Sequence, residues 1–137
     1  DNRIMYFADS FAGCMWEYDF DLATGAIENH RVFAQASNDG GHQDGATVDA
    51  DGFVWNAHIF AGRVVRYDPQ GQIEREIKIP TPQVTSCAFG GPDLNTLYIT
   101  TASMRMTRED LVTDPLAGSL FAVQTDVCGL PEPSFGG

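Results

Sequence analysis

The stretch GFVWNA at residues 52–57 occurs in similar form twice more in the chain, and this repetition decides the fold class. The segments RIMYFA at 3–8 and NTLYIT at 95–100 align with it through one aromatic residue each. These residues, Tyr6, Trp55 and Tyr98, are 49 and 43 residues apart. Because self-similarity at a period of about 40 to 50 residues is typical of propellers, we expect three copies of one β-rich unit.

Each copy continues in the same order. A small-residue turn and a second strand follow the aromatic strand, and in the first two copies a glycine turn then leads to a third strand that starts at Ile27 or Ile73. A further short strand precedes the second and third aromatic strands, at 46–49 and 86–89. Four short strands in one unit are the signature of a propeller blade. The sequence therefore predicts an all-β fold, whose blade units cover about 1–42, 43–82 and 83–137.

The first unit lacks its innermost strand, and helical patterning is nearly absent. The exception is a single turn after Thr107, which is expected to cap it, with Glu109 and Asp110 near its start. This turn is an insertion in the third unit. Three units cannot close a ring of the usual four to eight blades, and the chain starts at Asp1 inside a strand-like pattern. We therefore expect it to be a piece of a longer protein.

The composition is that of a globular protein, with 43% hydrophobic and 20% charged residues. The net charge of -11 disfavours nucleic acid and anionic membranes as partners, and no apolar stretch has the length of a spanning helix. We expect a cytoplasmic protein. Cys14, Cys87 and Cys128 show no paired spacing and are expected to be buried, reduced thiols.

Several motifs resemble the senescence marker protein, gluconolactonase and regucalcin family. They are QDGATVDADGFVW at 43–55, GRVVRYDP at 62–69 and VTSCAFGG at 84–91, which occur in the order and at the separations of that family. YFADS at 6–10 and DPLAG at 114–118 extend the match over nearly the whole chain. The chain is similar to the C-terminal half of such a protein.

This resemblance implies a six-bladed β-propeller, of which the chain covers about three consecutive blades, and the metal-dependent hydrolysis of sugar lactones to aldonic acids. It also implies one divalent ion on the axis, with Ca²⁺ as the first choice and Zn²⁺, Mn²⁺ or Mg²⁺ as alternatives. In the family a Glu, an Asn and the Asp of a Pro-Asp-Gly turn hold the ion. Only the Asp has a match here, Asp44, and Gln43 replaces the proline.

Asp44 is the candidate metal ligand and catalytic base, because carboxylate oxygens suit hard cations and can accept a proton from water. The alternative for Asp44 is an ordinary Asp-Gly turn residue. The dipeptide Asp51-Gly52 is expected to be such a turn. His42 and His58 are candidates for substrate contact, and a surface or packing role is the alternative for each. No serine-nucleophile motif is present.

Two functions remain open at this point. The first is a sugar lactonase that is incomplete in this fragment, with a small-molecule lactone as substrate. The second is a non-catalytic half-propeller, which acts as a calcium-binding or assembly module and dimerises. Terminal blades expose faces that normally pack on neighbours, so the missing N-terminal half or a second copy of the chain is the expected partner.

Overall fold

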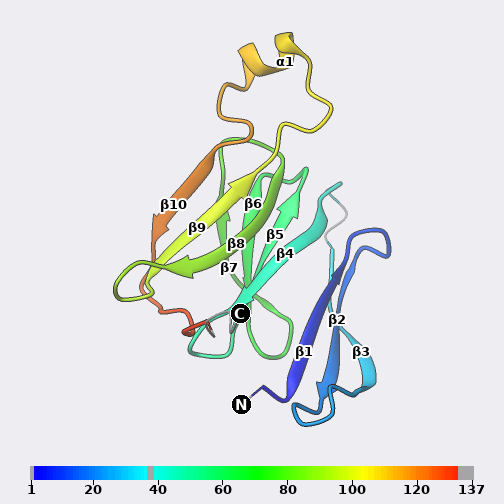
Figure 1. Ribbon diagram of the computed structural model, residues 1–137. Coiled ribbons are helices and arrows are strands. Elements are labelled where there is room, and N and C mark those ends of the chain that lie inside the picture. The colour runs from blue at the N-terminus through cyan, green and yellow to red at the C-terminus, as the bar shows by residue number, and fades with distance from the viewer. Residues whose placement is uncertain (1, 37–38, 133–137) are drawn as a thin grey trace.

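The computed structural model describes residues 2–36 and 39–132, which form ten strands and one short helix (Figure 1). The strands make three antiparallel sheets of consecutive strands. The first sheet consists of β1 Ile4–Asp9, β2 Cys14–Phe20 and β3 Ile27–Gln35. The second consists of β4 His42–Val48, β5 Val54–Ile59, β6 Arg63–Tyr67 and β7 Ile73–Lys78. The third consists of β8 Val84–Gly90, β9 Thr96–Thr101 and β10 Leu120–Gln124.

The expected strand order is confirmed. The first sheet starts with β1, the strand of Tyr6, and thus lacks the inner strand that β4 and β8 provide in the other two sheets. The third strands start at Ile27 and Ile73, as the sequence predicts. The inner strands are longer than expected, because their first residues also pair with β5 and β9.

The helix α1 Arg108–Thr113 forms where the sequence predicts a single turn. The Thr107 side chain accepts a hydrogen bond from the backbone of Asp110, and the Asp110 side chain accepts one from the backbone of Thr107. This capping box satisfies backbone donors that the helix leaves without partners. The helix projects from one end of the third sheet (Figure 1). Within the described residues no helix is long and apolar enough to cross a membrane.

The core lies on both faces of the second sheet, which is sandwiched between the other two. On one face it packs against the third sheet, through Trp55, Ala57, Val64, Cys87, Leu97 and Ile99. On the other face it packs against the first sheet, through Met15, Phe33, Val54, Val65 and Tyr67. Alternate residues of β5 thus serve different clusters, as the period of two in a strand requires.

Close backbone approach fixes the contact between the first and second sheets. Gly71, in the turn between β6 and β7, has a φ of +75° and lies against the carbonyl oxygen of Phe33. A Cβ at this position would overlap that oxygen. Only glycine combines this backbone conformation with so short an approach.

One expectation, the burial of all three cysteines, needs correction. Cys128 is exposed, whereas Cys14 and Cys87 are buried as expected. Cys128 belongs to the segment after β10, whose backbone bonds to the turn after β4 without burying the thiol. Trp16 and Tyr18 do not join the core with Trp55 and Tyr67. They lie beside His30 and are only partly buried, because their face of the first sheet points away from the second sheet.

Candidate functional site

Asp44 lies in a β-bulge near the start of β4. His42 pairs with Ile59 and Gln43 with His58, but the register shifts by one residue before Ala46 pairs with Asn56. Asp44 and Gly45 therefore lie inside the strand, which corrects the expectation of a turn before it. A bulge re-aims a side chain and interrupts the ladder of backbone hydrogen bonds, and bulges are frequent next to active sites.

Gly45 permits the inner strands of the second and third sheets to touch. A Cβ on Gly45 would overlap the side chain and the Cα of Ser86 in β8. The glycine is therefore required by close packing of the two strands rather than by its φ, which is not positive. This contact fixes the bulge against the neighbouring sheet.

Side chains bind the backbone carbonyls of the bulge. The Ser10 hydroxyl, in the turn after β1, donates a hydrogen bond to the carbonyl oxygen of Gln43 at 2.7 Å. The Nδ2 of Asn56 donates to the carbonyl oxygen of Asp44 at 2.7 Å and lies 3.3 Å from that of Gly45. Three successive carbonyls of the bulge thus have side-chain donors from two sheets.

The carboxyl group of Asp44 is partly buried in this bulge. Burial raises its pKa above the ordinary value, and a hydrogen bond from the backbone of Gly45 lowers the pKa by less. Neither influence is a positive charge. The charged carboxylate is thus destabilised by lost hydration, and a cation next to it would offset this cost. The oxygen donor and its environment fit one ligand position of a hard divalent ion.

His42 is exposed two residues before Asp44. Its Nδ1 lies 2.9 Å from the carbonyl oxygen of Ser10, and its ring meets the edge of Phe60 with centroids 6.1 Å apart. Phe60 has a φ of +69°, which is unusual for a residue with a side chain. Ser10 contacts β4 at two residues. Its hydroxyl binds the carbonyl oxygen of Gln43, and its carbonyl oxygen contacts the ring of His42.

His58 is fully buried, with 0% of its surface exposed. Its Nε2 lies 3.1 Å from the Tyr67 hydroxyl, and the two rings are stacked. Burial lowers the pKa of His58 to about 4, and the positive charge of Arg63 adds to this decrease. The ring of His58 thus lies inside the second sheet, in contact with Tyr67.

Among residues 2–36 and 39–132 there is no group of three or more His, Cys, Asp or Glu side chains that could hold a metal ion. Asp44, the one ligand that the resemblance predicts, lies at the bulge.

The family model described as SMP-30/gluconolactonase/LRE-like region matches residues 1–103. The chain belongs to this family. It is 40% identical to regucalcin of Danio rerio and 40% identical to 6-deoxy-6-sulfogluconolactonase of Pseudomonas putida, in each case over the whole chain and 47% of the relative. The chain thus spans about half the length of the curated relatives that it matches.

A solved structure shows the same architecture. The crystal structure of a calcium-binding protein, regucalcin, from Agrobacterium tumefaciens superposes with a TM-score of 0.90 at 31% identity, over 97% of this chain and 45% of that one. The chain therefore has the fold of a β-propeller of the six-bladed type, and its three sheets correspond to consecutive blades. The predicted fold class is confirmed.

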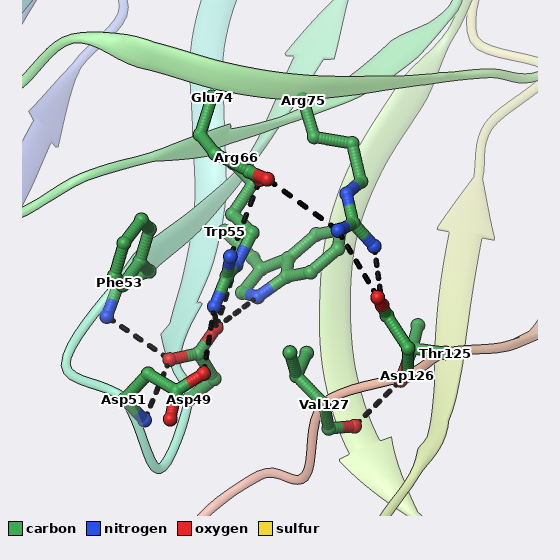
Figure 2. A network of polar contacts seen from close by, with 10 residues as sticks. All are labelled: Asp49, Asp51, Phe53, Trp55, Arg66, Glu74, Arg75, Thr125, Asp126 and Val127. Carbon is green, nitrogen blue, oxygen red and sulfur yellow. Dashed lines mark hydrogen bonds and ion pairs between the residues drawn. The ribbon is translucent and has the colours of Figure 1, made fainter.

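A second polar cluster in this gluconolactonase-family chain lies at the opposite end of β4, around Asp49 (Figure 2). Its carboxylate accepts hydrogen bonds from the backbone of Asp51 and Phe53, from Trp55 Nε1 at 2.8 Å and from Arg66 Nε at 2.8 Å. The Arg66 guanidinium lies 3.8 Å from the centroid of the Phe53 ring. Since Asp49 and Arg66 are buried, this cluster stabilises the turn that contains Asp51 and Gly52.

Sequence reasoning missed three polar residues of the second sheet and its neighbour. Asn56 and Ser10 hold the bulge, and Arg66 binds Asp49. A polar Asn in the centre of a mostly apolar strand was a signal that could have marked Asn56, because Asn is depleted in strands. No comparable signal marks Ser10, which lies in a loop.

Proposed function

We propose that a complete propeller containing this chain hydrolyses sugar lactones to aldonic acids with the help of a divalent ion, Ca²⁺ in the first place. Asp44 would be a ligand of this ion and the catalytic base. The observation that carries the proposal is the Asp44 carboxylate, which is partly buried in an inner-strand bulge, where burial raises its pKa.

The names of the relatives support this proposal. One of them is a lactonase of a sulfonated gluconolactone, and the superposed structure is that of a calcium-binding protein. The bulge that carries Asp44 falls within the part of the chain that the family model matches. The remaining ligands would come from the other half of a longer protein, or from a second copy of this chain.

A bound divalent ion would supply a Lewis acid for the lactone carbonyl and would lower the pKa of a water molecule. Asp44 would accept a proton from the attacking water while the water oxygen forms a bond to the carbonyl carbon. The bond between this carbon and the ring oxygen then breaks, and the ring oxygen leaves as a hydroxyl group because it takes up the proton that Asp44 accepted. The product is the open aldonic acid.

We propose different roles for the two histidines. His42 is exposed two residues from Asp44 and remains our candidate for contact with the sugar hydroxyls. His58 has no exposed surface, so we propose that it supports β5 and β6 through Tyr67 rather than touching the lactone.

The test is Asp44→Asn in a complete propeller that contains this chain. Asn keeps the shape and loses the charge, so we expect metal-dependent lactone turnover to fall by a factor of about 10² to 10⁴ with the fold intact. Asp51→Asn is the matched control, because Asp51 also precedes a glycine but lies in the turn after β4. It should change turnover little.

Undiminished turnover in the Asp44→Asn propeller would remove Asp44 from the mechanism. The isolated chain should show little turnover with or without the substitution, since the family's other ligands have no match in it. Full turnover of the isolated chain would show that the site is assembled differently, most simply between two copies.

A further inference from the structure

We propose that Asn56 is a positioning residue for Asp44, which fixes the bulge of β4 and thereby the direction of the Asp44 carboxylate. The proposal rests on the function proposed above for Asp44. Asn56 lies on β5, directly opposite the residue that ends the bulge, Ala46.

The hydrogen bonds of Asn56 are directed at the bulge itself. A bulge leaves backbone groups outside the regular ladder, and these groups need other partners when they are buried. The amide nitrogen of Asn56 lies 2.7 Å from the carbonyl oxygen of Asp44 and 3.3 Å from that of Gly45. One side chain therefore binds two successive peptide groups, the one between Asp44 and Gly45 and the one between Gly45 and Ala46.

The position of Asn56 is costly for a polar side chain. Asn56 is 0% exposed, and its cross-strand neighbour Val65 belongs to the apolar cluster between the first two sheets. Its Oδ1 is buried and has no hydrogen-bond partner among the described residues. A buried acceptor without a partner destabilises a fold, and an apolar residue such as valine would avoid this cost. Unlike valine, the amide of Asn56 donates hydrogen bonds to the carbonyl oxygens of the bulge.

Ser10 strengthens the same interpretation from the other side. Its hydroxyl binds the carbonyl oxygen of Gln43, so the peptide group before Asp44 is held from the first sheet and the one after it from β5. The backbone on both sides of Asp44 is thus fixed by side chains. With the neighbouring backbone fixed, the rotation of the Asp44 side chain is the main freedom that remains.

The consequence for an ion site follows from geometry. A ligand that must meet an ion at a set distance loses affinity when its backbone samples several arrangements, and loss of such supporting contacts typically weakens metal affinity or activity by about 10- to 100-fold. Removal of the Asn56 amide should therefore weaken ion binding even though Asn56 itself does not touch the ion.

The experiment compares Asn56→Val with Val65→Ala in a complete propeller that contains this chain. Valine is apolar and suits a strand, but it cannot donate to the carbonyls of Asp44 and Gly45. Val65→Ala perturbs the same layer of the core, directly across from Asn56, and leaves the bulge hydrogen bonds intact. Three measurements are made on each variant: Ca²⁺ and Mn²⁺ affinity by calorimetry, amide hydrogen exchange of residues 42–48, and thermal unfolding.

We expect Asn56→Val to weaken ion binding by about tenfold and to accelerate exchange in the bulge. Val65→Ala should lower thermal stability without changing either readout. Ion affinity and exchange rates equal to wild type in Asn56→Val would overturn the proposal and leave Asn56 a packing residue. Asn56→Ser is the substitute if Asn56→Val does not fold, and the same loss of affinity is expected, because one short hydroxyl cannot reach both carbonyls.

The wild-type measurement separates this inference from the proposed function. If the wild-type propeller neither binds the ions nor hydrolyses lactones, the proposed function fails and the role of Asn56 fails with it. If wild type does both and Asn56→Val matches it, only the role of Asn56 is wrong.

Discussion

The first and second sheets share one order of strands but have different surroundings. In the second sheet, β5 buries five of its six residues, whereas the corresponding strand β1 of the first sheet has no buried residue. The second sheet lies between the other two (Figure 1), while the first has a neighbour on one face only. Burial in this repeat is thus set by the neighbouring sheets and not by the pattern within one unit.

The same difference separates two arginine clusters. Arg66 of the second sheet is buried and binds Asp49 at 2.7 Å, with Asp51 and Glu74 at 3.2 Å. Arg31 of the first sheet is exposed and binds Glu17 and Asp19 across the strands. An ion pair in water contributes little because solvent screens it, whereas a buried charge depends on its partner. Ion pairs between similar residue types are therefore expected to contribute differently to the stability of the two sheets.

The largest effect on folding stability is expected from Asp49→Ala, in the second sheet. The substitution leaves the buried Arg66 without its closest partner and Trp55 Nε1 without an acceptor. We expect the free energy of unfolding, measured in urea on a complete propeller, to fall by about 3 to 5 kcal/mol.

Asp19→Ala is the control for Asp49→Ala in the first sheet. Since Asp19 and Arg31 are exposed, the urea midpoint should stay at the wild-type value. Equal losses in the two variants would mean that burial does not distinguish the sheets.

A smaller effect is expected from the buried His58 of the second sheet. Its pKa of about 4 lies below the value of about 6.5 for an unfolded chain, so the unfolded state binds more protons between these two pH values. The contribution of this lowered pKa to the free energy of unfolding is fully present above pH 6.5. It is lost as the pH falls toward 4, by about 3 kcal/mol in total.

His58→Gln removes this titration, so the unfolding free energy of the variant should fall less steeply than that of wild type between pH 6.5 and 4. Urea unfolding at several pH values measures the difference. Parallel pH profiles for the two proteins would show that His58 is protonated in the folded state and contradict its burial as the cause.

The smallest effect on folding stability is expected from Phe7→Ser in the first sheet. Phe7 is 49% exposed on the face that has no neighbouring sheet. We expect the unfolding free energy of the isolated chain to change by less than about 0.5 kcal/mol, as is usual for surface positions. The isolated Phe7→Ser chain should self-associate more weakly than the wild-type chain in sedimentation experiments, because exposed apolar faces drive association.

Val112→Ser is the control for Phe7→Ser, since Val112 is exposed on α1 away from this face. It should leave the sedimentation unchanged. A compact monomer of the wild-type chain at micromolar concentration would rule out the association altogether.

Much of the fold followed from the sequence because the repeat is local. The aromatic strands, the third strands from Ile27 and Ile73, and the cap at Thr107 all depend on residues close to each other in the chain. Burial was harder to predict. Trp16 and Trp55 are both strand tryptophans, and only the second has a sheet packed against it.

Residue types and their spacing predicted the repeat and the strand order, and the resemblance to the family added Asp44 as the candidate ligand. Residue types did not predict that Asp44 lies in a bulge, that Ser10 and Asn56 hold this bulge, or that His58 is buried, because these features depend on how the strands and sheets pack. The physical reason is distance along the chain. Ser10 and Gln43 are 33 residues apart and come from different sheets, so their hydrogen bond exists only when the sheets pack together.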